Sequence, residues 1–286
     1  MATETAARYC YRHPDRETGL SCSECGRPIC YECMTPAPVG LRCPEHSGKP
    51  QGVKKVTNAA GRMASGQSSR SGYPVTIALI AINVGIYLLE LALGGNQDGT
   101  GNKIWLHGAL VAKGSYLDGS PAGVANGEWW RLITSAFLHA GIFHLATNML
   151  GLYWLGRILE LLIGSWRYLL LYLASALSGA AGALWLSGPF DVTVGASGAI
   201  FGILGALLVL ERRGAINTGG QIIALIILNL LISFLPGISI GGHVGGFIGG
   251  AVLMMLYLQF RRANWMAVAS AVAVGVASVI VAYAVI

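Results

Sequence analysis

From Pro74 to the end of the chain, long apolar runs alternate with short polar breaks, and this pattern constrains the fold more than any other feature. Residues 74–286 hold only 9 Lys/Arg and 7 Asp/Glu. Across all 286 residues the charged fraction is 11%, whereas soluble domains carry roughly 25%. Such a chain cannot cover a water-facing surface, so the sequence excludes a soluble globular enzyme. We expect an all-α polytopic membrane protein in a lipid bilayer.

Seven apolar runs are each close to the roughly 20 residues that a helix needs to cross the hydrocarbon of a bilayer. The predicted spans are residues 74–93, 142–162, 167–187, 194–211, 219–236, 239–260 and 265–285. A polar, Gly/Ser-rich stretch at 47–73 predicts a flexible linker before the first span. The linker separates the membrane region from a cysteine-rich head at residues 8–46.

Positive side chains gather in alternate connections between the predicted spans. One side holds Arg157, Arg167, Arg212, Arg213, Arg261 and Arg262, while the other holds only Lys103, Lys113 and Arg131. The positive-inside rule therefore predicts a cytoplasmic N-terminus and an exterior C-terminus, in a bacterial type of plasma membrane. No apolar stretch opens the chain, so we expect no cleavable signal peptide. The net charge of +6 does not indicate nucleic acid as a partner, because the basic residues are scattered and an excess of Lys/Arg is ordinary in membrane proteins.

The connection at residues 94–141 is long and carries Trp105, Tyr116, Trp129 and Trp130. Aromatic side chains favour the membrane interface, so we expect part of this loop to lie there. Anchoring alone would explain the tryptophans. Control of access to a site, by this loop or by the fifth span, is a further hypothesis.

The head contains eight candidate metal ligands, in four pairs with a two-residue gap. The pairs are Cys10/His13, Cys22/Cys25, Cys30/Cys33 and Cys43/His46. This spacing lets one turn present two ligands to a tetrahedral zinc ion. Eight ligands make two four-coordinate sites without a free position, so we expect two structural Zn²⁺ and no catalytic metal. A reducing compartment and the small size of the head favour metal over three disulfides.

Two pairing orders are open to these ligands. A cross-brace joins the first pair with the third and the second with the fourth, whereas a sequential order joins neighbouring pairs. The short separation of Cys25 from Cys30 favours the cross-brace. In its ligand spacing this stretch resembles the B-box class of zinc fingers, which use a cross-brace. Such modules bind protein partners, and a cytoplasmic partner is therefore expected.

Four polar residues stand out within the predicted spans, where polar groups are costly: His144, Asn148, Ser197 and His243. In the predicted orientation all four come early in spans that begin outside, so they share one depth. Gly198/Gly202 and Gly246/Gly250 have the spacing that allows close helix approach. Such an approach would bring Ser197 within reach of His243, as a serine nucleophile and its histidine base require.

No acid at this depth completes a triad, so the sequence favours a Ser–His dyad. His144 and Asn148 are four residues apart, on one helical face, and could donate to an oxyanion together with the N–H of Ser197. Each residue also has a simpler interpretation. A membrane serine can bond its own backbone, Asn148 can join helices, and a buried histidine can relay protons or pack. The conjunction of all four carries the hypothesis.

The membrane region resembles the rhomboid family of intramembrane serine proteases over about residues 74–260. The matching motifs are Trp130-Arg131, His144-x-x-x-Asn148, Gly195-x-Ser197-Gly198 and His243-x-x-Gly246-x-x-x-Gly250. The resemblance implies a six-helix core at 74–260 with a seventh helix at 261–286, Ser197 and His243 as the dyad, and His144, Asn148 and Ser197 N–H as oxyanion donors. His139 also fits the family pattern and is interpreted as structural. Phe201 replaces a tyrosine common in the family and can still stack on His243.

The resemblance implies a protease that cuts single-pass membrane proteins in or near their transmembrane segments, with no cofactor for catalysis. A helical substrate hides its carbonyls, so it must unwind locally, and Gly or Pro near the cut would help. The alternative is a catalytically inactive rhomboid-like protein that binds membrane clients, with the head as an adaptor. A transporter is a third hypothesis, supported by neither an intramembrane acid nor a repeat.

Overall fold

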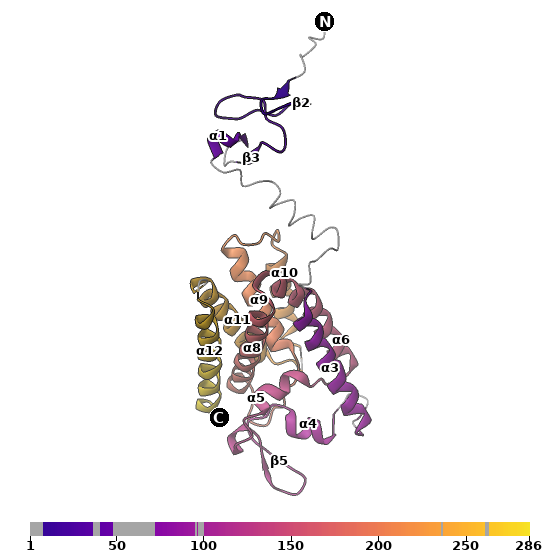
Figure 1. The fold of residues 1–286 in the computed structure, drawn as a ribbon. Coiled ribbons are helices and arrows are strands. Elements are labelled where there is room, and N and C mark those ends of the chain that lie inside the picture. Colours follow the sequence, from indigo (N-terminus) through magenta and orange to yellow (C-terminus); the bar gives the residue numbers. More distant parts are fainter. Residues whose placement is uncertain are drawn as a thin grey trace. The chain divides into compact units, whose positions relative to one another are not determined.

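The computed structural model describes residues 8–36, 41–47, 72–94, 96, 100–235, 237–260 and 263–286 (Figure 1). The chain divides into two compact units, Met1–Gly72 and Tyr73–Ile286. Nearly all of the linker predicted at 47–73 lies outside the described residues, as do Arg261 and Arg262.

The first unit is a small domain of short hairpins. Strands β1 (Tyr9–Cys10) and β2 (His13–Glu17) pair antiparallel, as do β3 (Thr35–Pro36) and β4 (Leu41–Arg42), and α1 (Pro44–Ser47) follows. Its buried core consists of five cysteines and Ile29. A core so poor in apolar side chains cannot stabilise the fold by burial alone, which fits a requirement for bound metal.

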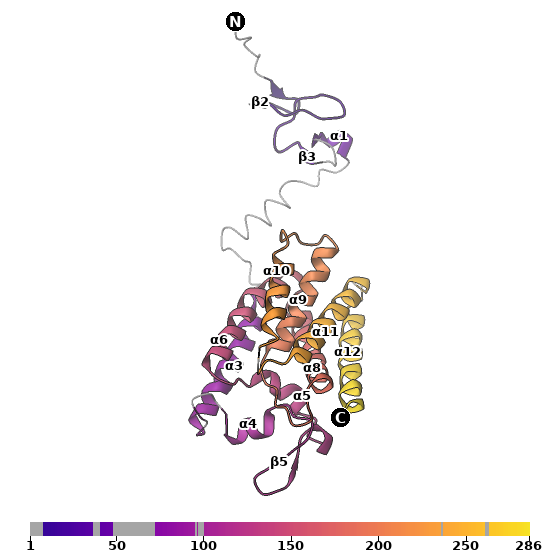
Figure 2. The same ribbon diagram turned by 180° about the vertical axis from the view of Figure 1, so that it is seen from behind.

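The second unit is a bundle of apolar helices (Figures 1 and 2). The helices of this bundle are α3 (Pro74–Ala92), α6 (Ile142–Gly151), α7 (Arg157–Ile163), α8 (Ser165–Leu186), α9 (Ser197–Arg212), α10 (Gln221–Ile232), α11 (Ile240–Gln259) and α12 (Asn264–Ala284). Four of them, α3, α8, α11 and α12, are long and apolar enough to cross a membrane, and α10 is a shorter apolar helix. The all-α membrane architecture is as predicted.

Two predicted spans need correction. The span at 142–162 is not one α-helix, because the π-helical turn η3 (Leu152–Gly156) separates α6 from α7. The span at 194–211 begins three residues too early: Gly195 has φ +122°, which a helix cannot accommodate, so α9 begins at Ser197. This late start places Ser197 in the first turn of its helix.

Helix α9 lies at the centre, against α8 and α11, at backbone contact distance. A Cβ added to Gly246 would strike the carbonyl oxygen of Gly198, and one added to Gly250 would strike that of Gly202. The close approach predicted from these four glycines is therefore confirmed. Helix α8 packs on the other face of α11 in the same way, because a Cβ on Gly245 would strike the carbonyl of Ser178.

The last helix, α12, packs against α8 and α11, on the opposite side of the bundle from α3 and α6 (Figures 1 and 2). Ser278 Oγ lies 2.8 Å from Ser178 Oγ across the α12–α8 contact. Helix α10 differs from the others, because within its bounds only Ile222 is buried.

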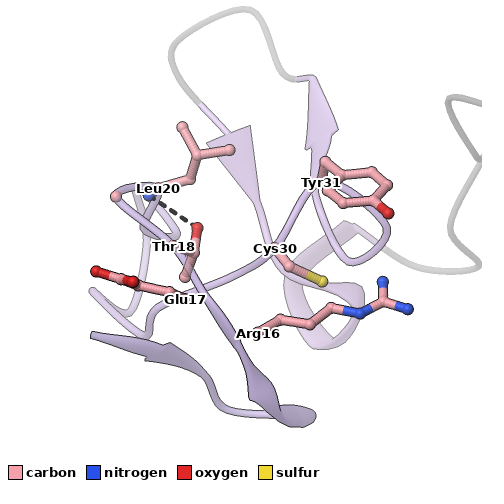
Figure 3. A pocket seen from close by; sticks show the side chains of 7 residues that line it. Arg16, Glu17, Thr18, Leu20, Cys30 and Tyr31 are labelled. Atoms are coloured by element: carbon pink, nitrogen blue, oxygen red, sulfur yellow. Dashed lines mark hydrogen bonds between the residues drawn. The ribbon is translucent and has the colours of Figure 1, made fainter. Parts of the chain in front are cut away.

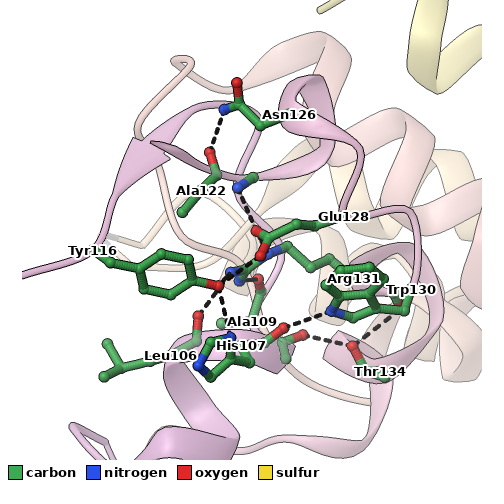
Figure 4. Close-up of polar contacts among 12 residues, drawn as sticks. Leu106, His107, Ala109, Tyr116, Ala122, Asn126, Glu128, Trp130, Arg131 and Thr134 are labelled. Atoms are coloured by element: carbon green, nitrogen blue, oxygen red, sulfur yellow. Dashed lines mark hydrogen bonds and ion pairs between the residues drawn. The ribbon is translucent and has the colours of Figure 1, made fainter. Parts of the chain in front are cut away.

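Residues 100–141 of the connection at 94–141, all of which the structure describes, contain α4 (Lys103–Gly108), the hairpin β5 (Gly114–Ser115)–β6 (Pro121–Ala122), the 3₁₀ helices η1 (Val124–Asn126) and η2 (Ser135–Phe137), and α5 (Arg131–Thr134). The buried Arg131 organises it (Figure 4). Its guanidinium donates to Glu128 at 2.7 Å and to the carbonyls of Ala109 and Leu106 at 2.6 and 2.8 Å.

The aromatic residues of this connection divide into two groups. Trp129 is 63% exposed, as an interfacial anchor would be. Trp130 Nε1 instead donates to the carbonyl of His107, and the Tyr116 hydroxyl donates to Glu128 (Figure 4). Anchoring therefore does not account for all of these side chains, because two of them hold the loop together.

Candidate active site

Ser197 is the first residue of α9 and is half-buried. Gly195 precedes it in a positive-φ conformation, and its N–H donates to the carbonyl of Ser135 at 2.9 Å. The first N–H groups of a helix have no partner within that helix. The N–H of Ser197 is therefore a donor beside its own hydroxyl, at the positive end of the helix dipole.

His243 lies in the first turn of α11, which begins after the N-cap Ser239. Its ring stacks on Phe201, with centroids 4.1 Å apart and an interplanar angle of 12°. Phe201 is one helical turn after Ser197, so the two residues share a face of α9. Just beyond Ser197, a Cβ on Gly198 would lie 3.3 Å from the Gly242 carbonyl. The structure thus brings Ser197 and His243 to one contact between α9 and α11.

His144, in α6, reaches the same place. A Cβ on Gly195 would lie 2.7 Å from His144 Nε2 and 3.8 Å from Ser197 Oγ, so both groups border one small space. The N–H of Ala140 donates to His144 Nδ1 at 3.3 Å. Because Nδ1 accepts this bond, the proton of the neutral ring lies on Nε2. His144 therefore presents an N–H donor to the space beside Ser197.

Asn148 is buried one turn further along α6. Its Nδ2 donates to the carbonyl of His144 at 2.8 Å, within the same helix. Its Oδ1 has no hydrogen-bond partner among the described residues. The predicted oxyanion donors therefore differ: His144 Nε2 borders the space beside Ser197, while one of the two N–H groups of the Asn148 amide is engaged with the backbone of α6.

His139 packs against the ring of His144. It is fully buried, and its ring meets that of His144 edge-to-face with centroids 5.1 Å apart. A packing contact of this kind agrees with a structural role and limits rotation of the His144 ring.

One residue of the site, Ser233, was not predicted from the sequence. It follows α10, is fully buried, and its Oγ lies 2.6 Å from His243 Nδ1. Its only sequence signal is a serine at the end of an apolar run, ten residues before His243. Serines in membrane helices commonly bond their own backbone, so this signal is weak without the fold.

The eight ligands of the head form two clusters, Cys10/His13/Cys30/Cys33 and Cys22/Cys25/Cys43/His46, each with its ligand atoms within 4.8 Å of one another. The grouping is that of the predicted cross-brace. His13 Nδ1 lies 3.3 and 3.4 Å from the sulfurs of Cys30 and Cys33, and the sulfurs of Cys25 and Cys43 are 3.8 Å apart. A tetrahedral zinc ion with bonds of about 2.0 to 2.3 Å separates its ligands by about 3.5 Å, so both clusters fit it.

The thiols of the two clusters differ in their pKa. Burial raises the pKa of Cys10 and Cys22, but backbone N–H donors outweigh it and lower the pKa of both to about 6. Burial and the neighbouring thiols instead raise the pKa of Cys33 to about 12 and that of Cys43 to about 11. All six cysteines are free. Thiolates are the form that binds zinc.

A shallow pocket lies beside the first cluster, lined by Arg16, Glu17, Thr18, Gly19, Leu20, Cys30 and Tyr31 (Figure 3). Arg16 forms an ion pair with Glu32 at 2.8 Å and lies over the Tyr31 ring. Its charge is already satisfied, so the pocket does not by itself indicate an anionic ligand.

Comparison with known proteins finds the Rhomboid domain at residues 126–260. Rhomboid protease GluP of Bacillus subtilis is 40% identical over 180 residues, which cover 61% of this chain and 33% of GluP. The Bacillus subtilis protein YdcA is 40% identical over 167 residues, covering 54% of this chain and 83% of YdcA. Rhomboid protease AarA of Providencia stuartii is 27% identical over 212 residues, covering 64% of this chain and 72% of AarA. The chain thus spans a third of GluP and most of the other two.

Proposed function

This chain belongs to the rhomboid family, and we propose that it is an intramembrane serine endopeptidase with Ser197 as nucleophile and His243 as general base. The observation that carries the proposal is the contact between α9 and α11. Phe201, one turn after Ser197, stacks on His243, and the His144 ring borders the same space. A nucleophile, a base and an oxyanion donor are what acyl transfer requires.

The proposed reaction begins when Ser197 Oγ attacks the carbonyl carbon of the peptide bond and its proton passes to His243 Nε2. The carbonyl oxygen becomes an oxyanion, which accepts hydrogen bonds from His144 Nε2–H and from the N–H of Ser197. His243 then gives its proton to the departing amine, leaving an acyl ester on Ser197. Water hydrolyses the ester, with His243 again taking and returning the proton.

Asn148 is proposed as a third donor to the oxyanion, which forms only on attack. One N–H of its Nδ2 donates to the His144 carbonyl, and the second N–H is left for the oxyanion. Interactions made only in the transition state raise kcat rather than substrate affinity. Asn148 is therefore assigned to stabilising the transition state, not to binding the substrate.

The proposed substrates are single-pass membrane proteins cut in or near their transmembrane segments. Helix α10 is the element best suited to let them in, because it is the least buried helix beside the site. Orientation by the positive-inside rule would place the site near the exterior face and the N-terminus in the cytoplasm. A substrate segment with Gly or Pro near the cut would unwind most easily.

Labelling by a fluorophosphonate probe in detergent tests the proposed dyad. We expect the unchanged protein to be labelled, and Ser197→Ala and His243→Ala to lose labelling while keeping their thermal unfolding midpoints. A folded, unlabelled wild-type protein that still binds membrane clients would overturn the protease and favour the inactive, client-binding alternative.

We also propose that the head holds two structural Zn²⁺, in a B-box-like cross-brace, and serves partner binding or regulation. The fit of both clusters to tetrahedral zinc supports the metal. Substrate cleavage by full-length Cys33→Ser, compared with the unchanged protein in cell membranes, tests the regulatory role. Unchanged turnover and client choice would count against it.

A further inference from the structure

The hydrogen bond between Ser233 and His243 involves Nδ1, whereas the nitrogen proposed to act as the base is Nε2. Resting on the proposed dyad, we infer that Ser233 is the positioning residue of this site: it holds the neutral His243 ring with its proton on Nδ1 and so leaves Nε2 free to act as the base. At the end of α10, a short chain of hydrogen bonds joins the Asn229 carbonyl, the Ser233 hydroxyl and His243 Nδ1.

Ser233 Oγ has two close polar neighbours, the carbonyl oxygen of Asn229 at 2.7 Å and His243 Nδ1 at 2.6 Å. A serine hydroxyl has one proton to donate and lone pairs to accept with. A carbonyl oxygen can only accept, so the hydroxyl proton goes to Asn229. The remaining bond must then run from His243 Nδ1–H to Ser233 Oγ.

This direction fixes the tautomer of His243. A neutral imidazole carries one proton, so a proton on Nδ1 leaves a lone pair on Nε2. When His243 takes the proton of Ser197, Ser233 still accepts from Nδ1–H and stabilises the charged ring. In serine hydrolases with a triad, a carboxylate fills this position. Here a neutral hydroxyl does so, in a region where the sequence offers no acid.

Burial protects the hydrogen bond between Ser233 and His243 from competition by water. Ser233 is fully buried, and His243 is 7% exposed, so water does not compete well for either group. Phe201 stacks on the ring of His243 and limits its tilt, whereas the bond to Ser233 limits its rotation in the plane. The two contacts together leave the ring one orientation.

The contact also links the base to α10. From Gln221 to Ser233, all of which the structure describes, only Ile222 and Ser233 are buried. At its end nearest the site, α10 is thus anchored by one buried residue, Ser233, which contacts His243. Outward movement of this end removes the acceptor from Nδ1, so His243 is held in its productive tautomer only while the end of α10 is packed against it.

The test compares Ser233→Ala with Ser270→Ala as a matched control. Ser270 is also nearly buried and also bonds the carbonyl four residues before it, at 2.7 Å, but it lies in α12. We expect Ser233→Ala to lower kcat about tenfold with KM unchanged, which corresponds to about 1.4 kcal/mol. Ser233→Thr, which keeps the hydroxyl, should restore most of kcat, and Ser270→Ala should retain all of it.

A second readout does not depend on turnover. In protein labelled with ¹⁵N-histidine, the shifts of the two ring nitrogens report which one is protonated, and His243→Gln identifies the signals of His243. We expect Nδ1 to be protonated in the unchanged protein and a mixture of tautomers in Ser233→Ala. A proton on Nε2 in the unchanged protein, or equal kcat in Ser233→Ala, would overturn the inference. Absence of fluorophosphonate labelling with the expected tautomer would instead overturn the proposed protease.

Discussion

The carboxylate of Glu160 is predicted to fix the start of α3, and its removal should destabilise the protein strongly. Glu160 lies in α7 and is 2% exposed. It accepts hydrogen bonds from the N–H groups of Val75 and Thr76 at 3.0 and 2.8 Å and from the hydroxyls of Thr76 and Ser165, both at 2.7 Å. The two N–H groups belong to the first turn of α3, where no helical carbonyl is available to them.

The size of the loss follows from which donors can find other partners. Hydroxyls can rotate, but the two backbone N–H groups cannot, and hydrogen bonds to a charged group contribute about 1.5–3 kcal/mol each. Glu160→Ala leaves both N–H groups unpaired, which predicts that the free energy of unfolding falls by about 3–6 kcal/mol. Glu160→Gln keeps one acceptor oxygen for Thr76 and turns an NH₂ toward Val75, which predicts about half of that loss.

Unfolding midpoints in detergent micelles titrated with SDS measure this series. Glu211→Ala is the control, because Glu211 also accepts from an N–H and a hydroxyl, those of Thr218, but at a more exposed helix end. We expect the order Glu160→Ala, Glu160→Gln, Glu211→Ala, from least to most stable. If both Glu160 variants unfold together with Glu211→Ala, the carboxylate does not hold α3 and the reasoning is wrong.

Three further predictions concern the site, the loop and the head. Gly195→Ala should abolish fluorophosphonate labelling, because its Cβ would lie 2.7 Å from His144 Nε2 at φ +122°, whereas Gly85→Ala, with open space around its Cβ, should be labelled normally. Burial would raise the pKa of Glu128, but its hydrogen bonds lower it, so its stabilisation is complete above about pH 4.3 and is lost as the pH falls through the lower folded value. The difference in thermal midpoint between wild type and Glu128→Gln should therefore be constant from pH 8 to about pH 5 and shrink below pH 4; a difference that grows on acidification would contradict this sign. Elemental analysis should find two zinc ions per chain and about one in Cys33→Ser; two in both would exclude Cys33 as a ligand.

Those parts of the fold that one dominant force determines could be predicted from the sequence. Apolar runs in a bilayer must form helices, because no water satisfies their backbone groups, and so the long helices α3, α8, α11 and α12 lie where hydropathy indicated. The glycine spacing predicted the contact of α9 with α11, since only residues without a Cβ allow backbones so close. Ligand spacing predicted the grouping in the head for a similar reason, because one turn can present only certain pairs to one ion.

Local backbone geometry could not be predicted in the same way. Hydropathy does not distinguish i→i+4 from i→i+5 hydrogen bonding, so the π-helical turn at Leu152–Gly156 was missed. The span predicted to begin at 194 was wrong because hydropathy does not report the positive φ of Gly195. Ser233 was missed because its role depends on a partner ten residues away across a turn, and a serine at that position normally bonds only its own helix.

Two histidine hydrogen bonds explain how a site without an acid can keep two neutral rings in different tautomers. His144 accepts an N–H from Ala140 on Nδ1 and therefore carries its proton on Nε2, as a donor. His243 donates from Nδ1 to Ser233 and therefore has its lone pair on Nε2, as a base. A carboxylate between them would accept from either ring and would favour the charged form of both. Neutral partners avoid this, because a backbone N–H and a serine hydroxyl can each direct one proton without adding charge at membrane depth. The division between base and oxyanion donor thus comes from the direction of each hydrogen bond. Ser233→Ala is expected to change the tautomer of His243 and to leave that of His144 unchanged.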